Sequence, residues 1–197
     1  MPPLVFATSN THKTAEVRAM LSGFEITDLR DHPGLTLPEE TGETFEANAI
    51  IKAAGASARL AGMLVLADDS GLEVDALGGA PGVRSARYSG ENATDATNRE
   101  KLKQELAKLP GSPALTARFR CYMALVRDGV TLHVAHGAVE GRLITREQGG
   151  GGFGYDPLFI PDGFSDTFGV LPPETKNQLS HRARALARMS AWMKENL

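Results

Sequence analysis

The feature that most constrains this chain is an apolar run that meets two adjacent acids. Residues 63–67, Met-Leu-Val-Leu-Ala, are followed at once by Asp68 and Asp69. A short apolar run of this kind is typical of a strand in the interior of a sheet. Unpaired charge at the edge of an apolar interior is unfavourable, so packing alone does not explain the acids. We therefore expect the strand to end at residue 67 and the two carboxylates to face a cation.

Two interpretations of this acid pair follow from the residues. If the strand is parallel and central, the acids lie at its carboxyl end, where open α/β sheets bind their ligands. Oxygen ligands without His or Cys partners suit Mg²⁺, which uses one or two carboxylates together with water and substrate phosphate. The alternative is that Asp68 caps a turn and Asp69 pairs with an arginine. The residues alone leave both open.

The order of apolar and polar segments predicts an α/β fold. We expect strands over residues 3–7, 24–29, 63–67, 114–127 and 130–140, and helices over residues 14–23, 44–60, 95–109 and from 180 onward. The sequence Asp128-Gly129 between two of these strands is a strong hairpin signal. Because α–β alternation is combined with a hairpin, we expect a mixed sheet flanked by helices, in a single domain over residues 1–197.

Composition excludes several functional classes. A chain of 197 residues with 42% hydrophobic content can form one sizeable core, and its net charge of −3 gives no general attraction to nucleic acid. No apolar stretch approaches the length of a membrane span, and the N-terminus lacks the basic region of a secretory signal. The single cysteine, Cys121, reads as a buried structural thiol. We expect a cytoplasmic protein with no nucleic-acid or membrane partner.

The first loop combines hydroxyls, an amide and a cation. In "TSNTHK", residues 8–13, a strand passes into a helix near Lys13, and exposed backbone N–H groups at a helix start favour a phosphate. The P-loop pattern is missing. The alternative is an ordinary helix cap with an exposed lysine.

Four glutamates surround the start of the helix expected over residues 44–60. Glu43 and Glu46 lie in its first turn, where the macrodipole favours them, so they are interpreted as structural. Glu39 and Glu40 precede the helix and are candidates for a functional site.

A glycine-rich loop and a basic segment complete the candidates. In "GGGGFGYDPLF" the glycines remove bulk, and Phe153 and Tyr155 offer faces on which a base can stack; the alternative is a flexible loop with two core aromatics. "KNQLSHRARAL" places Lys176, His181 and Arg182 around a helix start. Positive side chains there oppose the macrodipole, which indicates a bound anion or polar ligand. A solvated basic face is the alternative.

Taken together, these segments resemble the inosine triphosphate/xanthosine triphosphate pyrophosphatase family. The matching stretches are "TSNTHK", "EETGETFEANAIIKA", "LADDSGLEVDALGGAPGVRSARYSG", "GGGGFGYDPLF" and "SHRARAL", spread over nearly the whole chain. The resemblance implies an elongated mixed β-sheet flanked by helices, with two lobes around a central cleft. It also implies a homodimer that uses Mg²⁺ and hydrolyses ITP, dITP and XTP to the monophosphate and pyrophosphate.

The resemblance also implies roles for particular residues. Asp69 becomes the general base and a metal ligand, Glu39 the second metal ligand, and Glu40 and Asp68 less certain contacts. Water activated by Asp69 would attack the α-phosphorus. The substrate-binding residues implied are Thr8, Ser9, Asn10, Thr11, His12, Lys13, Ser70, Phe153, Gly154, Tyr155, Asp156, Lys176, His181 and Arg182.

The residues also bear on base choice and on two rival functions. A donor such as Arg182 can hydrogen-bond the 6-carbonyl of hypoxanthine or xanthine but not the 6-amino group of adenine. Septum-inhibition-type pyrophosphatases share a similar architecture, yet they favour an Arg-rich first loop, whereas this chain has Asn10 and Lys13. A nucleotide sensor that binds without hydrolysis would not need the acids at 68 and 69.

Overall fold

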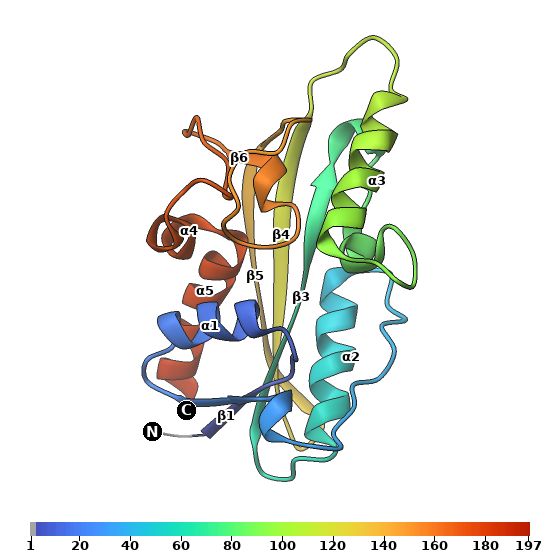
Figure 1. The fold of residues 1–197 in the computed structure, drawn as a ribbon. Helices are drawn as coiled ribbons and strands as arrows, with labels where there is room; N and C mark the ends of the chain where they lie inside the picture. Colours follow the sequence, from blue (N-terminus) through green and yellow to red (C-terminus); the bar gives the residue numbers. More distant parts are fainter. Residues whose placement is uncertain (1–2) are drawn as a thin grey trace. The chain divides into compact units, whose positions relative to one another are not determined.

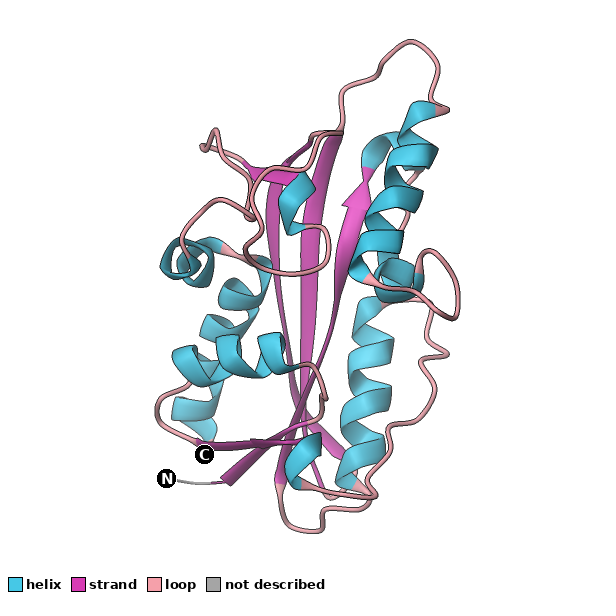
Figure 2. Ribbon diagram, viewed as in Figure 1, coloured by secondary structure: helices cyan, strands magenta, loops and turns pink. Residues whose placement is uncertain are grey.

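The computed structural model describes residues 3–197, which form six strands and five α-helices (Figures 1 and 2). The strands are β1 (Pro3–Phe6), β2 (Glu25–Asp28), β3 (Leu64–Val74), β4 (Thr116–Arg127), β5 (Val130–Leu143) and β6 (Phe159–Pro161). The helices are α1 (Thr11–Met20), α2 (Phe45–Ser57), α3 (Asp95–Ala107), α4 (Pro173–Leu179) and α5 (His181–Asn196). Within residues 3–197, every helix is too short or too polar to cross a bilayer.

The strands form one mixed sheet in the order β2-β1-β3-β4-β5-β6. Strand β1 pairs in parallel with both β2 and β3, whereas β5 and β6 pair antiparallel. Strands β4 and β5 are joined by Asp128-Gly129, and both residues have positive φ, at 50° and 77°. This is the backbone of a tight hairpin turn. The predicted α/β class, the mixed sheet and the hairpin are confirmed.

The chain divides into two compact units. The first comprises the described residues through Asp69 together with Cys121–Gly137 and Arg182–Leu197, and the second comprises Ser70–Arg120 and Ala138–His181. Strands β3, β4 and β5 each contribute residues to both units.

In the first unit, β3 has helices on both faces (Figure 1). Leu64 and Leu66 pack in one cluster with Val17 of α1 and Leu186 of α5. Val65 and Ala67 pack in a second cluster, with alanines of α2. Because successive side chains of a strand point to opposite faces, each residue's position in β3 fixes which helices it meets.

The second unit has its own apolar core. Leu72 and Val74 of β3 pack there with Leu102 of α3 and with Phe119 and Phe159 from β4 and β6. Phe119 meets Phe159 edge-on, with ring centroids 4.8 Å apart. The helix predicted over residues 95–109 is confirmed as α3 and packs through one side on this core.

Several elements differ from the sequence predictions. The strand expected to end at residue 67 continues to Val74, because residues 72 and 74 are apolar and bury in the second unit's core. Helix α1 is capped at Leu21 rather than Gly23. Helix α4, which begins at Pro173, was missed because its seven residues give no apolar stripe.

Candidate active site

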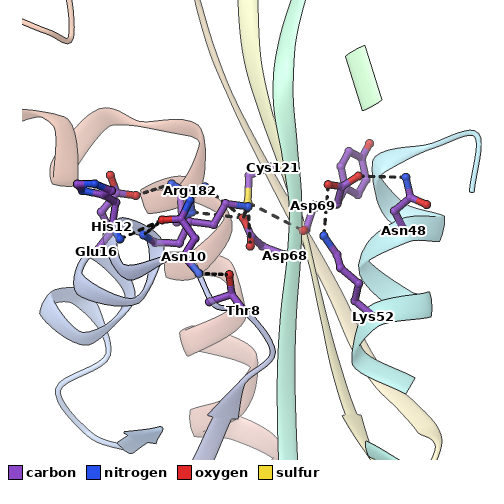
Figure 3. Close-up of polar contacts among 12 residues, drawn as sticks. Thr8, Asn10, His12, Glu16, Asn48, Lys52, Asp68, Asp69, Cys121 and Arg182 are labelled. Carbon is purple, nitrogen blue, oxygen red and sulfur yellow. Dashed lines mark hydrogen bonds and ion pairs between the residues drawn. The ribbon is translucent and has the colours of Figure 1, made fainter. Parts of the chain in front are cut away.

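Asp68 and Asp69 lie inside β3, not after its end. Strand β1 pairs with β3 only as far as Phe6, opposite Leu66, so the acids come just past the parallel pairing. Continuing the alternation of residues 64–67, Asp68 faces α1 and α5 and Asp69 faces α2 (Figure 3). Both are buried, at 2% and 6% exposure. The two carboxylates therefore have different surroundings despite being adjacent in sequence.

Asp68 is held by two cations. Lys13 Nζ lies 3.0 Å from both of its oxygens, and Arg182 donates through Nη2 at 3.2 Å. Burial alone would raise the pKa of Asp68, but Lys13 and Arg182 outweigh burial and hold the pKa well below its ordinary value. Cys121, which is fully buried beside Asp68, is confirmed as a structural thiol, and burial raises the pKa of that thiol. Asp68 is therefore a buried anchor whose charge two cations of the protein neutralise.

Arg182 bridges two carboxylates near the start of α5. Its guanidinium is 1% exposed and donates to Asp68 and, through Nη1, to Glu16 of α1. The sequence suggested that basic residues at this helix start indicate a bound anion. At Arg182, the structure supplies that negative charge from two protein carboxylates.

Asp69 lies against two polar side chains of α2. Asn48 donates through Nδ2 to Oδ2 at 3.2 Å, and Lys52 Nζ lies 3.4 Å from Oδ1 (Figure 3). Burial raises the pKa of Asp69 above its ordinary value; Lys52 opposes this effect, and Glu40 adds to it. A buried carboxylate whose pKa is raised is suited to accept a proton.

Two carboxylates converge on the Lys52 ammonium. Glu40 Oε1 accepts from Nζ at 2.8 Å, on the same ammonium that pairs with Asp69. Burial alone would lower the pKa of Lys52, but Asp69, Asp68 and Glu40 outweigh it and raise the pKa, so the cation persists.

This arrangement fits a hard cation. Asp69 and Glu40 are oxygen donors that already share one positive charge. Glu39, the glutamate implied as a metal ligand, is exposed. Among residues 3–197, no three His, Cys, Asp or Glu side chains cluster as a ready metal site. The donor set matches Mg²⁺, which takes one or two carboxylates and completes its shell with water and phosphate oxygens.

Asn48 and Lys52 were missed by sequence reasoning. They lie four residues apart and interrupt the buried face that Ala49 and Ala53 share on α2. Both are buried, at 0% and 7% exposure. Buried polar groups need partners, so two polar side chains at helical spacing beside an alanine stripe were the signal available in the sequence.

The first loop is organised by its own side chains. Asn10 caps α1, and its Oδ1 accepts from the backbone N–H groups of His12 and Lys13 at 3.0 and 3.1 Å. Thr8 Oγ1 accepts from the Asn10 N–H at 3.2 Å. The cap interpretation is thus realised at Asn10, while Lys13 turns to Asp68. Ser9, Thr11 and His12 are exposed.

In the second unit, Asp156 joins the glycine-rich loop to α4. Its Oδ2 accepts from the Phe153 N–H at 2.8 Å and from Lys176 Nζ at 2.7 Å. The Lys176 ammonium also lies over the Phe153 ring, 4.5 Å from its centroid. Three predicted residues therefore lie together, with Asp156 buried and Phe153 half-buried.

Other predicted residues of the second unit have structural surroundings. Tyr155 is 4% exposed and donates its hydroxyl to the Ser85 carbonyl at 2.8 Å, so it belongs to the core, as the alternative interpretation held, and does not offer an open face. The His181 ring stacks on Phe119 at 4.9 Å. Ser70 follows Asp69 in β3 and is half-buried.

Two glycines of the loop are required by close approach. A Cβ on Gly152 would lie 2.0 Å from Asp156 Oδ2, and one on Gly149 would lie 2.0 Å from the Gly169 carbonyl oxygen. Both residues have positive φ, at 70° and 79°. The glycine run thus lets the loop close onto Asp156 and residue 169.

We expect Gly152→Ala to lower the free energy of unfolding by about 2 kcal/mol or more, from left-handed strain and displacement of Asp156. Gly150→Ala is the matched control, because no atom lies within 4 Å of its added Cβ. Urea denaturation of both variants measures the difference. Equal midpoints for the two would contradict this account of the loop.

Comparisons with known proteins give one consistent result. The family model described as the Ham1 family matches residues 4–192. A protein of Geobacter sulfurreducens named dITP/XTP pyrophosphatase is 48% identical over 189 residues, which cover 95% of this chain and 94% of that protein. A protein of Desulforamulus reducens with the same name is 46% identical, covering 94% and 92%. A solved HAM1 protein from Coxiella burnetii superimposes with a TM-score of 0.88 at 39% identity, covering 99% and 100%.

Proposed function

Because the chain belongs to the Ham1 family, we propose that it hydrolyses non-canonical purine nucleoside triphosphates, namely ITP, dITP and XTP, to the monophosphate and pyrophosphate. Two relatives that are 46–48% identical to this chain over nearly its full length are named dITP/XTP pyrophosphatases, which supports this substrate class. The reaction would remove altered purines from the nucleotide pool.

The observation that carries the proposal is the contrast between the two acids of β3. Asp68 is neutralised by Lys13 and Arg182, whereas Asp69 is buried with a raised pKa. Asp69 is therefore the general base of the proposal: it takes a proton from the water that attacks the α-phosphorus, and pyrophosphate leaves. The different partners of the two carboxylates support the choice of Asp69 over Asp68.

The first unit would also bind the triphosphate. We assign this role to the loop Thr8–Lys13, because it lies at the start of α1 and Lys13 brings a cation to the same strand as Asp69. The Lys13 side chain is 17% exposed, so its ammonium can exchange part of its contact with Asp68 for phosphate oxygens. Positive charge at the phosphates is the main source of stabilisation in such reactions.

Mg²⁺ is the cofactor of the proposal. Asp69 and a glutamate of the pair Glu39–Glu40 would hold the metal; the position of Glu40 beside Lys52 supports Glu40, and the resemblance supports Glu39. When bound, the metal would neutralise phosphate charge. Loss of activity in EDTA and recovery with Mg²⁺ would support this assignment.

We assign purine binding to side chains of the second unit. Phe153 offers a half-buried ring for stacking, and Lys176 and His181 are the remaining substrate contacts. The role of Arg182 as a donor that distinguishes a 6-carbonyl from a 6-amino group comes from the family resemblance; in the structure its guanidinium donates to Asp68 and Glu16. Ser70, Gly154, Tyr155 and Asp156 complete the proposed set. Tyr155, Asp156, Lys176 and His181 are all buried, at 3–5% exposure, so their contribution would be mainly to hold the site in place.

The direct test is incubation of the purified protein with ITP and Mg²⁺, followed by a pyrophosphate assay. Release of pyrophosphate and IMP in equal amounts supports the proposal. Stoichiometric binding of ITP without turnover would indicate a sensor instead. Preferential cleavage of pyrimidine triphosphates would indicate the septum-inhibition type.

We expect Lys52→Met to move the acid limb of the pH–rate profile to higher pH. The Lys52 ammonium lowers the pKa of Asp69, so its removal raises that pKa further. Because the base must be deprotonated to act, activity is then lost at a higher pH on acidification. Measuring kcat/KM for ITP from pH 5 to 9 checks the direction, with Lys101→Met on the exposed surface of α3 as control. If the acid limb of the profile stays at the same pH or moves to lower pH, Lys52 does not lower the pKa of the base.

We further propose that the protein acts in the cytoplasm, as its composition suggests, and that it forms a homodimer, as the family resemblance implies. Light scattering should give a mass of twice the 21.0 kDa of one chain. A monomer at micromolar concentration would contradict the dimer.

A further inference from the structure

Helix α3 carries a polar stripe that contacts the glycine-rich loop and the residues just before it. Asp95, Arg99 and Lys103 follow one another at four-residue spacing, which places them on one face of the helix. Each contacts a residue between 147 and 154. We call these three side chains the α3 clamp. All of them lie in the second unit, with the loop they contact.

The clamp holds the loop at two points. At Gly154, Asp95 Oδ2 accepts from the backbone N–H at 2.7 Å, and Arg99 Nη1 donates to the carbonyl oxygen at 2.9 Å. At Glu147, Arg99 Nε lies 3.1 Å from Oε2, and Lys103 Nζ lies 3.4 Å from Oε1. The N-terminal and C-terminal parts of the loop are thus tied to one rigid helix.

The grip at Gly154 bears directly on Phe153. The N–H of Gly154 belongs to the peptide that follows Phe153, and Asp95 binds it. The N–H of Phe153 belongs to the peptide that precedes it, and Asp156 binds it at 2.8 Å. Both peptides flanking Phe153 are therefore fixed by carboxylates, which limits the rotation of the backbone that carries its ring.

Gly154 needs this support. Its φ is +61°, a conformation that glycine reaches readily and leaves readily. Without side-chain contacts, such a residue adds freedom to the loop at the position after the aromatic ring. Binding a ligand to a mobile loop requires that the loop be ordered, which weakens affinity.

We infer that Asp95 and Arg99 are positioning residues, which act through the Gly154 peptide to orient Phe153 for purine binding. This inference rests on the proposed function for the role of Phe153, but the clamp itself is a property of the fold. Loss of the clamp raises KM for ITP and leaves kcat nearly unchanged, because the chemistry at Asp69 is not touched.

The test uses Asp95→Ala and Arg99→Met in the full-length protein. Lys101→Met is the matched control for Arg99→Met, because it removes one positive charge from the same helix. The ion pair described for Lys101 is with Glu105 on α3 itself and not with the loop. Asp95→Asn is the conservative variant, because its amide oxygen still accepts from the Gly154 N–H.

Two readouts separate the clamp from a general loss of stability. Hydrogen exchange of a peptide spanning residues 147–156 is expected to accelerate about tenfold in Asp95→Ala and Arg99→Met, and not in Lys101→Met or Asp95→Asn. In the same two variants KM for ITP is expected to rise about tenfold, with kcat within about twofold of the wild type.

Either readout can overturn the inference. Unchanged exchange in both variants would show that α3 does not order the loop. Faster exchange with unchanged KM, or with a loss confined to kcat, would show that ordering does not serve binding. If the wild-type protein releases no pyrophosphate from ITP, the proposed function fails, and the exchange measurement then decides the clamp by itself.

Discussion

Replacing Asp69 by asparagine is expected to reduce kcat for ITP by at least about a thousandfold, the range associated with loss of a general base. Asparagine keeps the size of the side chain and an oxygen that can accept from Asn48 and Lys52. It loses the ability to take a proton from water. The rate of pyrophosphate release from saturating ITP with Mg²⁺ measures the effect.

The fold should survive this change. Burial raises the pKa of Asp69, which means that folding disfavours the ionised form of this carboxylate. Removing its charge therefore does not take away a stabilising contribution to the native state. The free energy of unfolding should therefore change by less than about 1 kcal/mol, as measured in urea. Asp162→Asn, on the exposed surface, is the control for loss of one carboxylate. Near-normal pyrophosphate release from the Asp69 variant would remove this residue from the role of base.

The wild-type pH profile provides a second view of the same residue. Because the pKa of Asp69 lies above the ordinary aspartate value of 3.8, activity should begin to fall on acidification at a pH above that value. The fall follows protonation of the base rather than unfolding. Circular dichroism over the same pH range distinguishes the two.

Replacing Asp68 by asparagine is expected to lower the free energy of unfolding by about 3–5 kcal/mol. The change removes the buried charge that Lys13 and Arg182 share, and it leaves the 1% exposed Arg182 with Glu16 as the remaining carboxylate of the two it bridges. Removal of one partner from a buried ion pair is strongly destabilising because the remaining charge stays out of water. For a chain of this length, the midpoint of thermal unfolding should fall by about 10 °C.

A matched control separates burial from charge. Asp75→Asn also breaks contacts with an arginine, Arg118, but that pair is exposed, so the thermal midpoint should stay essentially unchanged. Equal midpoints for the two variants would contradict the assignment of Asp68 as a buried anchor.

The acid dependence of stability should follow the same residue. The pKa of Asp68 is depressed in the folded protein, so its contribution is present above the ordinary aspartate pKa and is lost as pH falls through the lower, folded value. In Asp68→Asn, this part of the acid-induced loss should be missing. Urea midpoints of both proteins measured from pH 5 down to about pH 1, the range in which such a contribution is lost, give the difference.

Several elements were predictable because their causes are local. Thr44 caps α2 through the Ala47 N–H, as its position before an apolar stripe predicts. Asp128-Gly129 turns between β4 and β5 because both residues tolerate positive φ. The strand at residues 64–67 was also predicted, but its continuation through the two acids was not. The pattern of apolar residues does not show which distant side chains will pair with a buried charge.

The sequence by itself determined that two acids follow a buried apolar run, and the family resemblance indicated the substrate class and a role for Asp69. The residues alone gave no physical reason to separate the two acids: Lys13 and Arg182 lie 55 and 114 residues from Asp68, and Lys52 lies 17 residues from Asp69. Only the tertiary structure decides which cation meets which carboxylate, because the alternation of β3 sends the two side chains to opposite faces. Charge neutralisation depends on distance through space in a medium of low dielectric, so the anchor and the base are distinguished by packing and not by residue type.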